Sequence, residues 1–252
     1  MMEFGREDDL RGARFTEANL AGARFRDVVL TDARITGALL DRADISGSIN
    51  GLKVNGIEVA PLVERELTRL HPERAKLSAV DPDGLREAWS TIEELWEPTL
   101  ARARRLPEAR LHERVDDEWS FVETLRHLVF VTDAWISRTV LGAAGHYHPL
   151  GLPHSENHDT DALQLDHDAD PTFDEVLDAR RSRMATVRDV VDRLTPGEAQ
   201  RTCAANPAPG YPPQTVFQVR ACLGIVFDEE WWHHQYATRD LDELERKERS
   251  RS

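Results

Sequence analysis

The stretch Phe227-Asp-Glu-Glu-Trp-Trp-His-His-Gln-Tyr236 places acids, imidazoles and aromatic rings side by side near the C-terminus. Apolar residues on both sides of it recur at spacings of three and four, which predicts one amphipathic helix over residues 214–245. This apolar stripe consists of Val216, Val219, Leu223, Val226, Ala237, Leu241 and Leu244. A polar cluster inside such a helix is either a metal site or a costly part of the core.

Two overlapping pairs of glutamate and histidine occur in this stretch, Glu229 with His233 and Glu230 with His234. Residues four apart project from the same side of a helix, and this spacing suits two ligands of a single ion. The apolar stripe continues through Glu230 and His234, whereas the other pair lies nearer its edge. We therefore predict that Glu230 and His234 are metal ligands.

An alternative interpretation of this pair needs no metal. A buried carboxylate needs a partner, because desolvating an isolated charge is costly. Glu230 could bond an arginine or a tryptophan indole instead, and His234 could be a hydrogen-bonded histidine of the core. The spacing alone leaves both interpretations open.

The composition bounds the class of protein. With 252 residues the chain has room for one large domain or two small ones, and we expect two. A net charge of −14 argues against a surface that binds duplex nucleic acid. The two cysteines form neither a disulfide framework nor a CxxC pair. Without an apolar run long enough to span a membrane or a leader segment, we expect a cytoplasmic protein with no membrane partner.

The first fifty residues repeat with a period of five, which fits neither a helix nor a strand. A large apolar residue stands at every fifth position: Leu10, Phe15, Leu20, Phe25, Leu30, Ile35, Leu40 and Ile45. A small or apolar residue precedes most of them by two places, as Ala13 and Ala18 do, and polar residues fill the rest. We expect the large side chains to fill an interior.

The run Ala18-Asn-Leu-Ala-Gly-Ala-Arg-Phe25 resembles the pentapeptide-repeat family. The resemblance implies a right-handed, four-sided β-helix with four repeats per coil, so eight repeats would make about two coils. Long members of the family imitate the shape and charge of DNA, but two coils are short for that role. We expect a capping or docking module instead.

Four long helices are predicted after a connecting region. Residues 51–60 read as a turn and short strand, and a short helix follows from Pro61 to about His71. The long helices cover about 82–106, 120–141, 172–194 and 214–245. Ser120 with Glu123, and Thr172 with Glu175, have the spacing of capping boxes. Four amphipathic helices indicate a four-helix bundle.

A long irregular segment, residues 142–171, separates the second and third helices. It contains His146, His148, His154, His158 and His167. Loops of this length in compact domains are functional or disordered. The histidines could bind an ion or stay solvated, and the segment could cover a pocket.

A third ligand is available on the second helix, because a catalytic ion commonly takes three protein ligands and keeps one open position. His127 lies in the most apolar part of that helix, 125–131. Taken alone, it is better explained as a core histidine bonded to a neighbour.

The segments 118–129, 133–135 and 229–237 together resemble the DinB-like four-helix superfamily, over about residues 81–245. The resemblance implies one histidine ligand on the second helix and two ligands four residues apart on the last. Many members have histidine at both positions, and a branch resembling mycothiol-dependent maleylpyruvate isomerase has glutamate and then histidine. Carried onto this chain, the metal ligands are His127, Glu230 and His234. Glu229, His233 and Asp133 are candidates to orient ligands or move protons.

The predicted fold class is α+β: a short β-helix of pentapeptide repeats at 1–59, a connecting helix and linker at 60–80, and an all-α DinB-like bundle at 81–252. The resemblance implies a divalent ion, Zn²⁺ first with Ni, Mn and Fe open, and a low-molecular-weight thiol cosubstrate. The expected function is a metal-dependent transferase, isomerase or hydrolase for a small electrophilic molecule. The alternatives are a non-catalytic metal-binding interaction protein that docks through its repeats, and a DNA mimic. A homodimer is also open.

Overall fold

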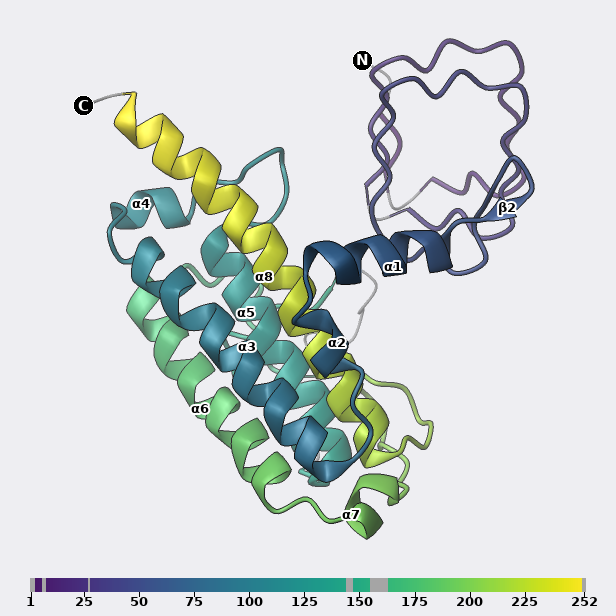
Figure 1. The fold of residues 1–252 in the computed structure, drawn as a ribbon. Helices are drawn as coiled ribbons and strands as arrows, with labels where there is room; N and C mark the ends of the chain where they lie inside the picture. The colour runs from purple at the N-terminus through teal and green to yellow at the C-terminus, as the bar shows by residue number, and fades with distance from the viewer. Residues whose placement is uncertain (1–2, 6–7, 27, 144–146, 155–162, 251–252) are drawn as a thin grey trace. The chain divides into compact units, whose positions relative to one another are not determined.

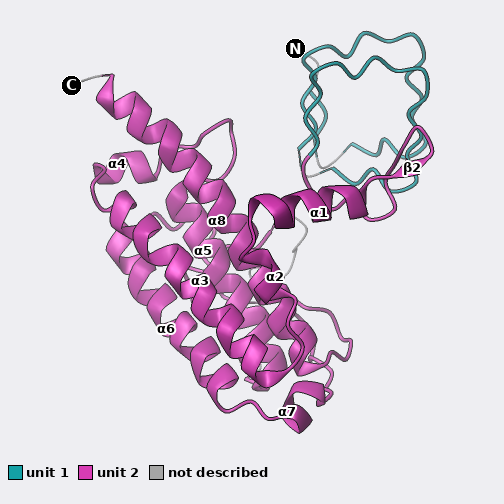
Figure 2. Cartoon of the chain, in the orientation of Figure 1, with its two compact units in different colours: residues 1–45 teal, residues 46–252 magenta. Residues whose placement is uncertain are grey.

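The computed structural model describes residues 3–5, 8–26, 28–143, 147–154 and 163–250. The chain divides into two compact units, residues 1–45 and 46–252 (Figure 2). The first unit contains the repeats, and the second is mostly helical (Figure 1). In the described residues, no helix is both long and apolar enough to cross a lipid bilayer.

The repeat unit bends at a spacing of five residues. A backbone hydrogen bond of 3.0 Å closes a turn every ten residues, as from the Ala13 N–H to the Leu10 carbonyl and from the Ala23 N–H to the Leu20 carbonyl. These turns need a positive φ at their third residue, which Gly12 and Gly22 supply with φ of 75° and 76°. Positive φ also occurs midway between these turns, at Glu17 and Gly37, so the period of five in the sequence is a period of backbone bends. The path is four-sided in Figure 1.

The large apolar side chains of the repeats are not buried, which differs from the expected interior. At every fifth position from Leu10 to Ile45, the exposed fraction of the residue lies between 43% at Leu10 and 65% at Ile35. Stacked repeats bury a continuous core only when neighbours cover each of them, and eight repeats leave many side chains uncovered. The part of 1–45 that the structure describes also contains no assigned strand.

The second unit begins with a short hairpin and two short helices. Strand β1 (Lys53–Val54) pairs antiparallel with β2 (Ile57–Glu58) across Asn55-Gly56, a dipeptide typical of tight hairpins. Helix α1 (Ala60–Leu70) follows, with a proline in its first turn. Helix α2 (Arg74–Leu77) packs against α3 (Pro82–Ala103) and α8 (Val219–Arg249). The predicted short helix after residue 60 is confirmed.

Two of the long helices begin at their predicted capping boxes. Helix α3 (Pro82–Ala103) is capped by Asp81, while α5 (Phe121–Thr132) and α6 (Phe173–Asp192) have the two predicted capping boxes. Helix α8 (Val219–Arg249) is the longest of these elements. The short helices α4 (Glu108–Leu111) and α7 (Pro196–Gln200) lie in the connections.

Two helix boundaries differ from the prediction. The last helix begins at Val219 and not near 214, because residues 217–219 pair their backbone with 201–203 through the Thr202–Gln218 bridge. The second helix continues from α5 into a π-helix, η1 (Asp133–Val140). Inserted π segments are often found at functional sites.

The long helices pack around one core. Helix α3 contacts α6 and α8, and α5 contacts the same two helices (Figure 1). Trp89 and Trp96 of α3 and Phe227 of α8 are at most 1% exposed. All described residues of α5 except Glu123 are buried, as its nearly continuous apolar sequence predicts. This packing places the middle of α5 directly beside the middle of α8.

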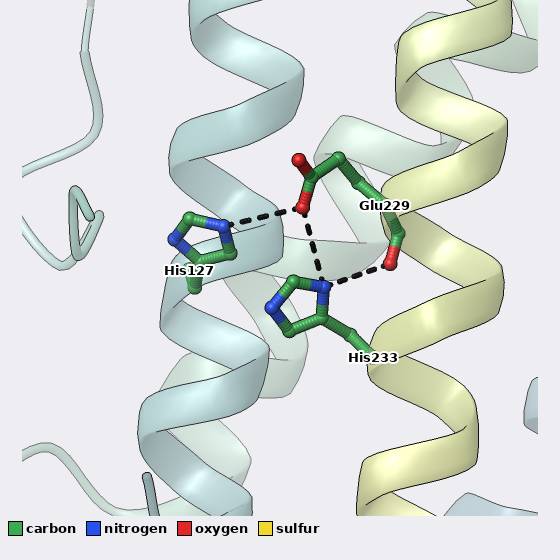
Figure 3. Close-up of side chains that lie close together, drawn as sticks. All are labelled: His127, Glu229 and His233. Atoms are coloured by element: carbon green, nitrogen blue, oxygen red, sulfur yellow. Dashed lines mark hydrogen bonds and ion pairs between the residues drawn. The ribbon is translucent and has the colours of Figure 1, made fainter. Parts of the chain in front are cut away.

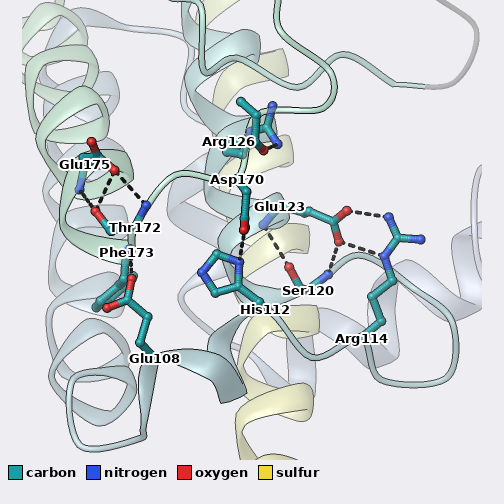
Figure 4. A network of polar contacts seen from close by, with 11 residues as sticks. Glu108, His112, Arg114, Ser120, Glu123, Arg126, Asp170, Thr172, Phe173 and Glu175 are labelled. Carbon is teal, nitrogen blue, oxygen red and sulfur yellow. Dashed lines mark hydrogen bonds and ion pairs between the residues drawn. The ribbon is translucent and has the colours of Figure 1, made fainter.

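Polar contacts surround the N-terminal ends of α5 and α6 (Figure 4). Glu108 of α4 accepts a hydrogen bond from the Phe173 N–H at 2.9 Å, and His112 lies 3.1 Å from the Asp170 carboxylate. Both contacts join the start of α6 to α4 and to the residue that follows it.

Candidate metal centre

His127 lies at the middle of α5 with only 4% of its surface exposed. Its Nδ1 lies 2.9 Å from the carbonyl oxygen of Leu152. A carbonyl oxygen can only accept a hydrogen bond, so Nδ1 donates and Nε2 keeps its lone pair. Nε2 faces α8 and lies 3.5 Å from Oε2 of Glu229. The imidazole is thus held in the tautomer that metal-ligating histidines use.

Glu229 and His233 lie one turn apart on α8 and face His127 (Figure 3). His233 Nδ1 lies 2.8 Å from the backbone oxygen of Glu229 and 3.3 Å from its Oε2. One potential ligand atom from each of the three side chains lies within 4.8 Å of the other two. In the described part of the chain, this is the group that could hold a metal ion.

The three side chains differ in their access to solvent. The side chain of His127 is 5% exposed, that of His233 14% and that of Glu229 37%. The ring of Trp119 lies 4.6 Å from the His127 ring, and Tyr236 meets His233 edge-on at 5.9 Å. The cluster therefore has a buried histidine side, aromatic neighbours and one side open at Glu229.

The surroundings favour an ionised glutamate and a neutral histidine. Burial alone would raise the pKa of Glu229, but a protonated His127 that donates a hydrogen bond to it, and the nearby His233 and His154, lower this pKa below its usual value. Burial lowers the pKa of His233 to about 4, and a positive charge on His127 acts in the same direction. A carboxylate and a neutral imidazole are the forms that bind metal ions.

The donor set fits a divalent ion. With the imidazole neutral, the His127 Nε2 lone pair and the Glu229 carboxylate are two acceptors 3.5 Å apart, and a positive charge, either a proton on Nε2 or a metal ion, joins them. Ligand atoms on one tetrahedral zinc ion stand roughly 3.3 Å apart, given bonds of about 2.0 Å. The separation of 3.5 Å between His127 Nε2 and Glu229 Oε2 is close to that value. His233 Nδ1 donates to the backbone oxygen of Glu229, so Nε2 is the nitrogen of His233 with a free lone pair. Two histidines and one carboxylate occur in catalytic zinc sites and in non-haem iron sites.

The predicted ligand Glu230 does not lie in this cluster. Its carboxylate is 1% exposed and accepts two hydrogen bonds from the Arg180 guanidinium, at 2.9 Å and 2.5 Å. Arg180 also stacks over Trp96, with Cζ 4.7 Å from the ring centroid. The prediction that Glu230 joins His127 is therefore corrected, and the alternative with an arginine partner describes its position.

The predicted ligand His234 also lies elsewhere. Its Nε2 lies 2.9 Å from the Thr99 hydroxyl and 3.0 Å from the Leu95 carbonyl, both on α3. The ring meets Trp96 edge-on at 5.1 Å. His234 is thus a hydrogen-bonded core histidine, as the alternative interpretation described. Of the three predicted ligands, the structure leaves only His127 in the cluster.

Asp133 was predicted to orient ligands or move protons, but it serves a different region. Its buried carboxylate accepts hydrogen bonds from Arg183 at 3.0 Å and 3.1 Å and from the His148 N–H at 2.8 Å. It therefore joins η1, α6 and the segment after η1. The other two candidates for this role, Glu229 and His233, are the residues that face His127.

The histidines of the segment 142–171 were candidates for binding an ion. His146 and His158 lie outside the described residues. His148 Nδ1 accepts a hydrogen bond from the Leu150 N–H at 3.2 Å, and His154 meets the Tyr211 ring edge-on at 4.9 Å. The described histidines of this segment do not belong to the metal-ligand group found among the described residues.

A sequence signal for the ion pair between Arg180 and Glu230 did exist. Arg180 lies four residues after Val176 and four before Met184, so it falls on the apolar stripe of the third helix. A buried arginine requires an acid from a facing stripe, and Glu230 is the acid on the last helix's stripe. A site with an open coordination position needs the edge of the stripe, where Glu229 and His233 lie.

Comparison with known families agrees with this geometry. The family model of the DinB superfamily matches residues 91–237, more than half of the chain, so this protein belongs to the DinB superfamily. A model of pentapeptide repeats matches eight copies over residues 9–47. No curated protein and no solved structure matches the chain. The superfamily membership and the His/Glu cluster support a metal-binding protein.

Proposed function

We propose that the protein is a metal-dependent enzyme that binds a divalent ion through His127, Glu229 and His233 and acts on a small electrophilic molecule. The observation that carries this proposal is the hydrogen bond from His127 Nδ1 to the Leu152 carbonyl, which leaves Nε2 facing the two side chains of α8. Zn²⁺ is the first choice of ion, and the long helices form the four-helix bundle that holds it.

The reaction that we propose uses a low-molecular-weight thiol or water as the nucleophile. A bound divalent ion would lower the pKa of such a ligand, so that it is a thiolate or hydroxide at neutral pH. The chain's own contribution is to hold two neutral imidazoles and one carboxylate, with the more exposed Glu229 at the side where a substrate enters. Trp119 and Tyr236 stand beside the histidines and limit the access of water.

We expect untagged protein to contain about one equivalent of a divalent ion. His127→Ala, Glu229→Ala and His233→Ala each remove a ligand, and we expect each to weaken affinity by more than about 100-fold, since even residues that only orient ligands are worth 10–100-fold. His234→Gln is the matched control, because His234 lies next to His233 but bonds Thr99. Metal analysis and competition with a chelator measure the affinities. Full retention by the three ligand variants would reject the site.

A metal-binding protein that carries no reaction is the second candidate, and the exposed apolar side chains of the repeats favour it as a docking protein. Turnover distinguishes the two. Electrophiles are screened with several small thiols, using the metal-loaded protein and the Glu229→Ala variant. Conjugation or hydrolysis that requires both the metal and Glu229 supports the enzyme. Bound metal without turnover supports the docking protein.

We propose, further, that the repeats form a right-handed, four-sided β-helix that serves as a docking or capping module. Backbone turns at a spacing of five residues support this arrangement. Backbone NMR chemical shifts of the full chain are the test. We expect extended residues between positive-φ turns at 12, 17, 22, 32, 37, 42 and 47. Random-coil shifts throughout residues 8–45 would contradict the proposal.

A further inference from the structure

The guanidinium of Arg126, the residue before His127, holds backbone carbonyls that lie far away in the sequence. Nε donates to the Leu150 oxygen at 2.9 Å, and the two terminal nitrogens donate to Ala169 at 2.7 Å and Asp166 at 2.5 Å. Arg126 is only 3% exposed. It lies beside the contacts that surround the N-terminal ends of α5 and α6 in Figure 4. One buried side chain therefore binds two separate stretches of the segment after η1.

The same segment orients His127. We call residues 148–152 the strap. The Leu152 N–H donates to the Arg126 backbone oxygen at 3.1 Å, and the Leu152 oxygen accepts from His127 Nδ1 at 2.9 Å. The side chain of Arg126 thus holds the strap at Leu150 while its backbone holds the strap at Leu152. The carbonyl that sets the His127 tautomer therefore follows directly on two backbone groups that Arg126 holds.

The strap is closely packed around Gly151. The Gly151 N–H donates to the His148 oxygen at 2.8 Å and closes a turn. A Cβ on Gly151 would lie 3.1 Å from the His148 oxygen, 3.3 Å from Leu165 Cδ2 and 3.4 Å from Phe130 Cβ. These distances are tighter than ordinary contacts, so the turn sits pressed between α5 and Leu165. A small displacement there moves the adjacent Leu152 carbonyl.

We infer that Arg126 is a positioning residue for the proposed metal centre: by binding the strap, it places the Leu152 carbonyl that directs His127 Nε2 toward Glu229 and His233. This inference rests on the proposed function. A guanidinium is suited to the task because its planar array of donors reaches several carbonyls at once, which an ammonium group on a lysine cannot reproduce. Partners that orient a metal-binding histidine commonly contribute 10–100-fold to metal affinity.

The chain offers a matched control. Arg138, in η1, is 4% exposed and donates to the backbone oxygens of Pro207 and Pro209, the latter at 2.9 Å. It has the same chemistry as Arg126, a buried guanidinium on loop carbonyls, but it does not contact the strap carbonyl that bonds His127. Arg126→Gln and Arg138→Gln should therefore both lower the melting temperature, while only the first should alter the metal centre.

Co²⁺ titration followed by visible absorption is the first measurement. We expect Arg126→Gln to weaken Co²⁺ binding by about 10–100-fold and to change the absorption bands. Arg138→Gln should retain the wild-type affinity within about threefold and the same bands, and Arg126→Lys should not recover the full affinity. Equal weakening by Arg126→Gln and Arg138→Gln, or no weakening by Arg126→Gln, would overturn the inference.

A second measurement does not depend on metal. Imidazole ¹⁵N NMR of the metal-free protein reports the His127 tautomer, which we expect to be Nδ1–H in the wild type and in Arg138→Gln, and to be lost in Arg126→Gln. If the wild type binds no Co²⁺, the proposed function fails, and the tautomer alone decides whether Arg126 orients His127. If Arg126→Gln does not fold, Gly151→Ala is measured in its place, because the added Cβ is expected to displace the strap. An unchanged Nδ1–H signal in the variant used would overturn the inference.

Discussion

Glu230→Leu should lower the free energy of unfolding by about 3–5 kcal/mol, because it leaves the buried Arg180 guanidinium without its carboxylate. Both side chains are at most 2% exposed, so water cannot replace the lost partner. The Arg180 Nε is already a buried donor without a partner in the described part of the chain. Both terminal nitrogens of Arg180 donate to Glu230, and no other acid is hydrogen-bonded to Arg180 among the described residues. Urea unfolding of the metal-free protein measures the loss.

The double variant Arg180→Met/Glu230→Leu should recover most of this loss. Replacing a buried ion pair by apolar residues of similar volume is often neutral or stabilising. We expect the double variant to keep its metal affinity, since neither residue belongs to the His127 cluster. Glu118→Ala, which breaks the exposed pair with Arg239, is the control and should cost at most about 1 kcal/mol. A double variant as unstable as Glu230→Leu would disprove the explanation.

The metal-free protein should lose up to about 3 kcal/mol of stability as the pH falls from about 6.5 to about 4, through His233 alone. In the unfolded chain this histidine takes up a proton at its ordinary pKa of about 6.5, but burial lowers its pKa to about 4 in the folded protein. Between these values the unfolded state binds more protons. The contribution of His233 to the free energy of unfolding is therefore fully present above about pH 6.5 and is lost as the pH falls from about 6.5 to about 4.

Urea unfolding at pH 7.0 and 4.5 in the presence of a chelator tests this prediction. His233→Gln cannot titrate, so its stability should fall less over the same interval, by about 2–3 kcal/mol relative to the wild type. Acids elsewhere in the chain are shared by both proteins and cancel in the comparison. Equal losses in the two proteins would show that His233 is not buried as a neutral imidazole.

The helices could be predicted from local chemistry. The capping boxes at Ser120 and Thr172 satisfy backbone groups within four residues, and apolar spacing fixes which face of each helix is buried. The π-helix could not be predicted in this way, because its hydrogen-bond register depends on the packing of η1 against α6 and α8. The start of α8 depends on pairing with residues 201–203, which no local pattern shows.

The candidate site could be predicted only in part. The structure brings His127 of the second helix together with a glutamate and a histidine of the last helix, which are the residue types and the helices that the sequence indicated. The choice between the two Glu/His pairs could not be predicted, because the stripe shows which residues are buried but not which neighbour each one meets. Glu230 meets Arg180 and not His127, and that contact depends on how α6 packs against the other helices.

The sequence by itself determined the period of the repeats, the order of the helices, their caps and buried faces, and a short group of residues able to bind a metal. These properties depend on spacing along the chain, so nearby residues are enough to specify them. The tertiary structure alone decided that Glu229 and His233 face His127 while Glu230 meets Arg180. Successive residues of a helix point about 100° apart, so a rotation of α8 by about that angle would exchange the two pairs, and the packing of α3, α5 and η1 against α8 sets the rotation.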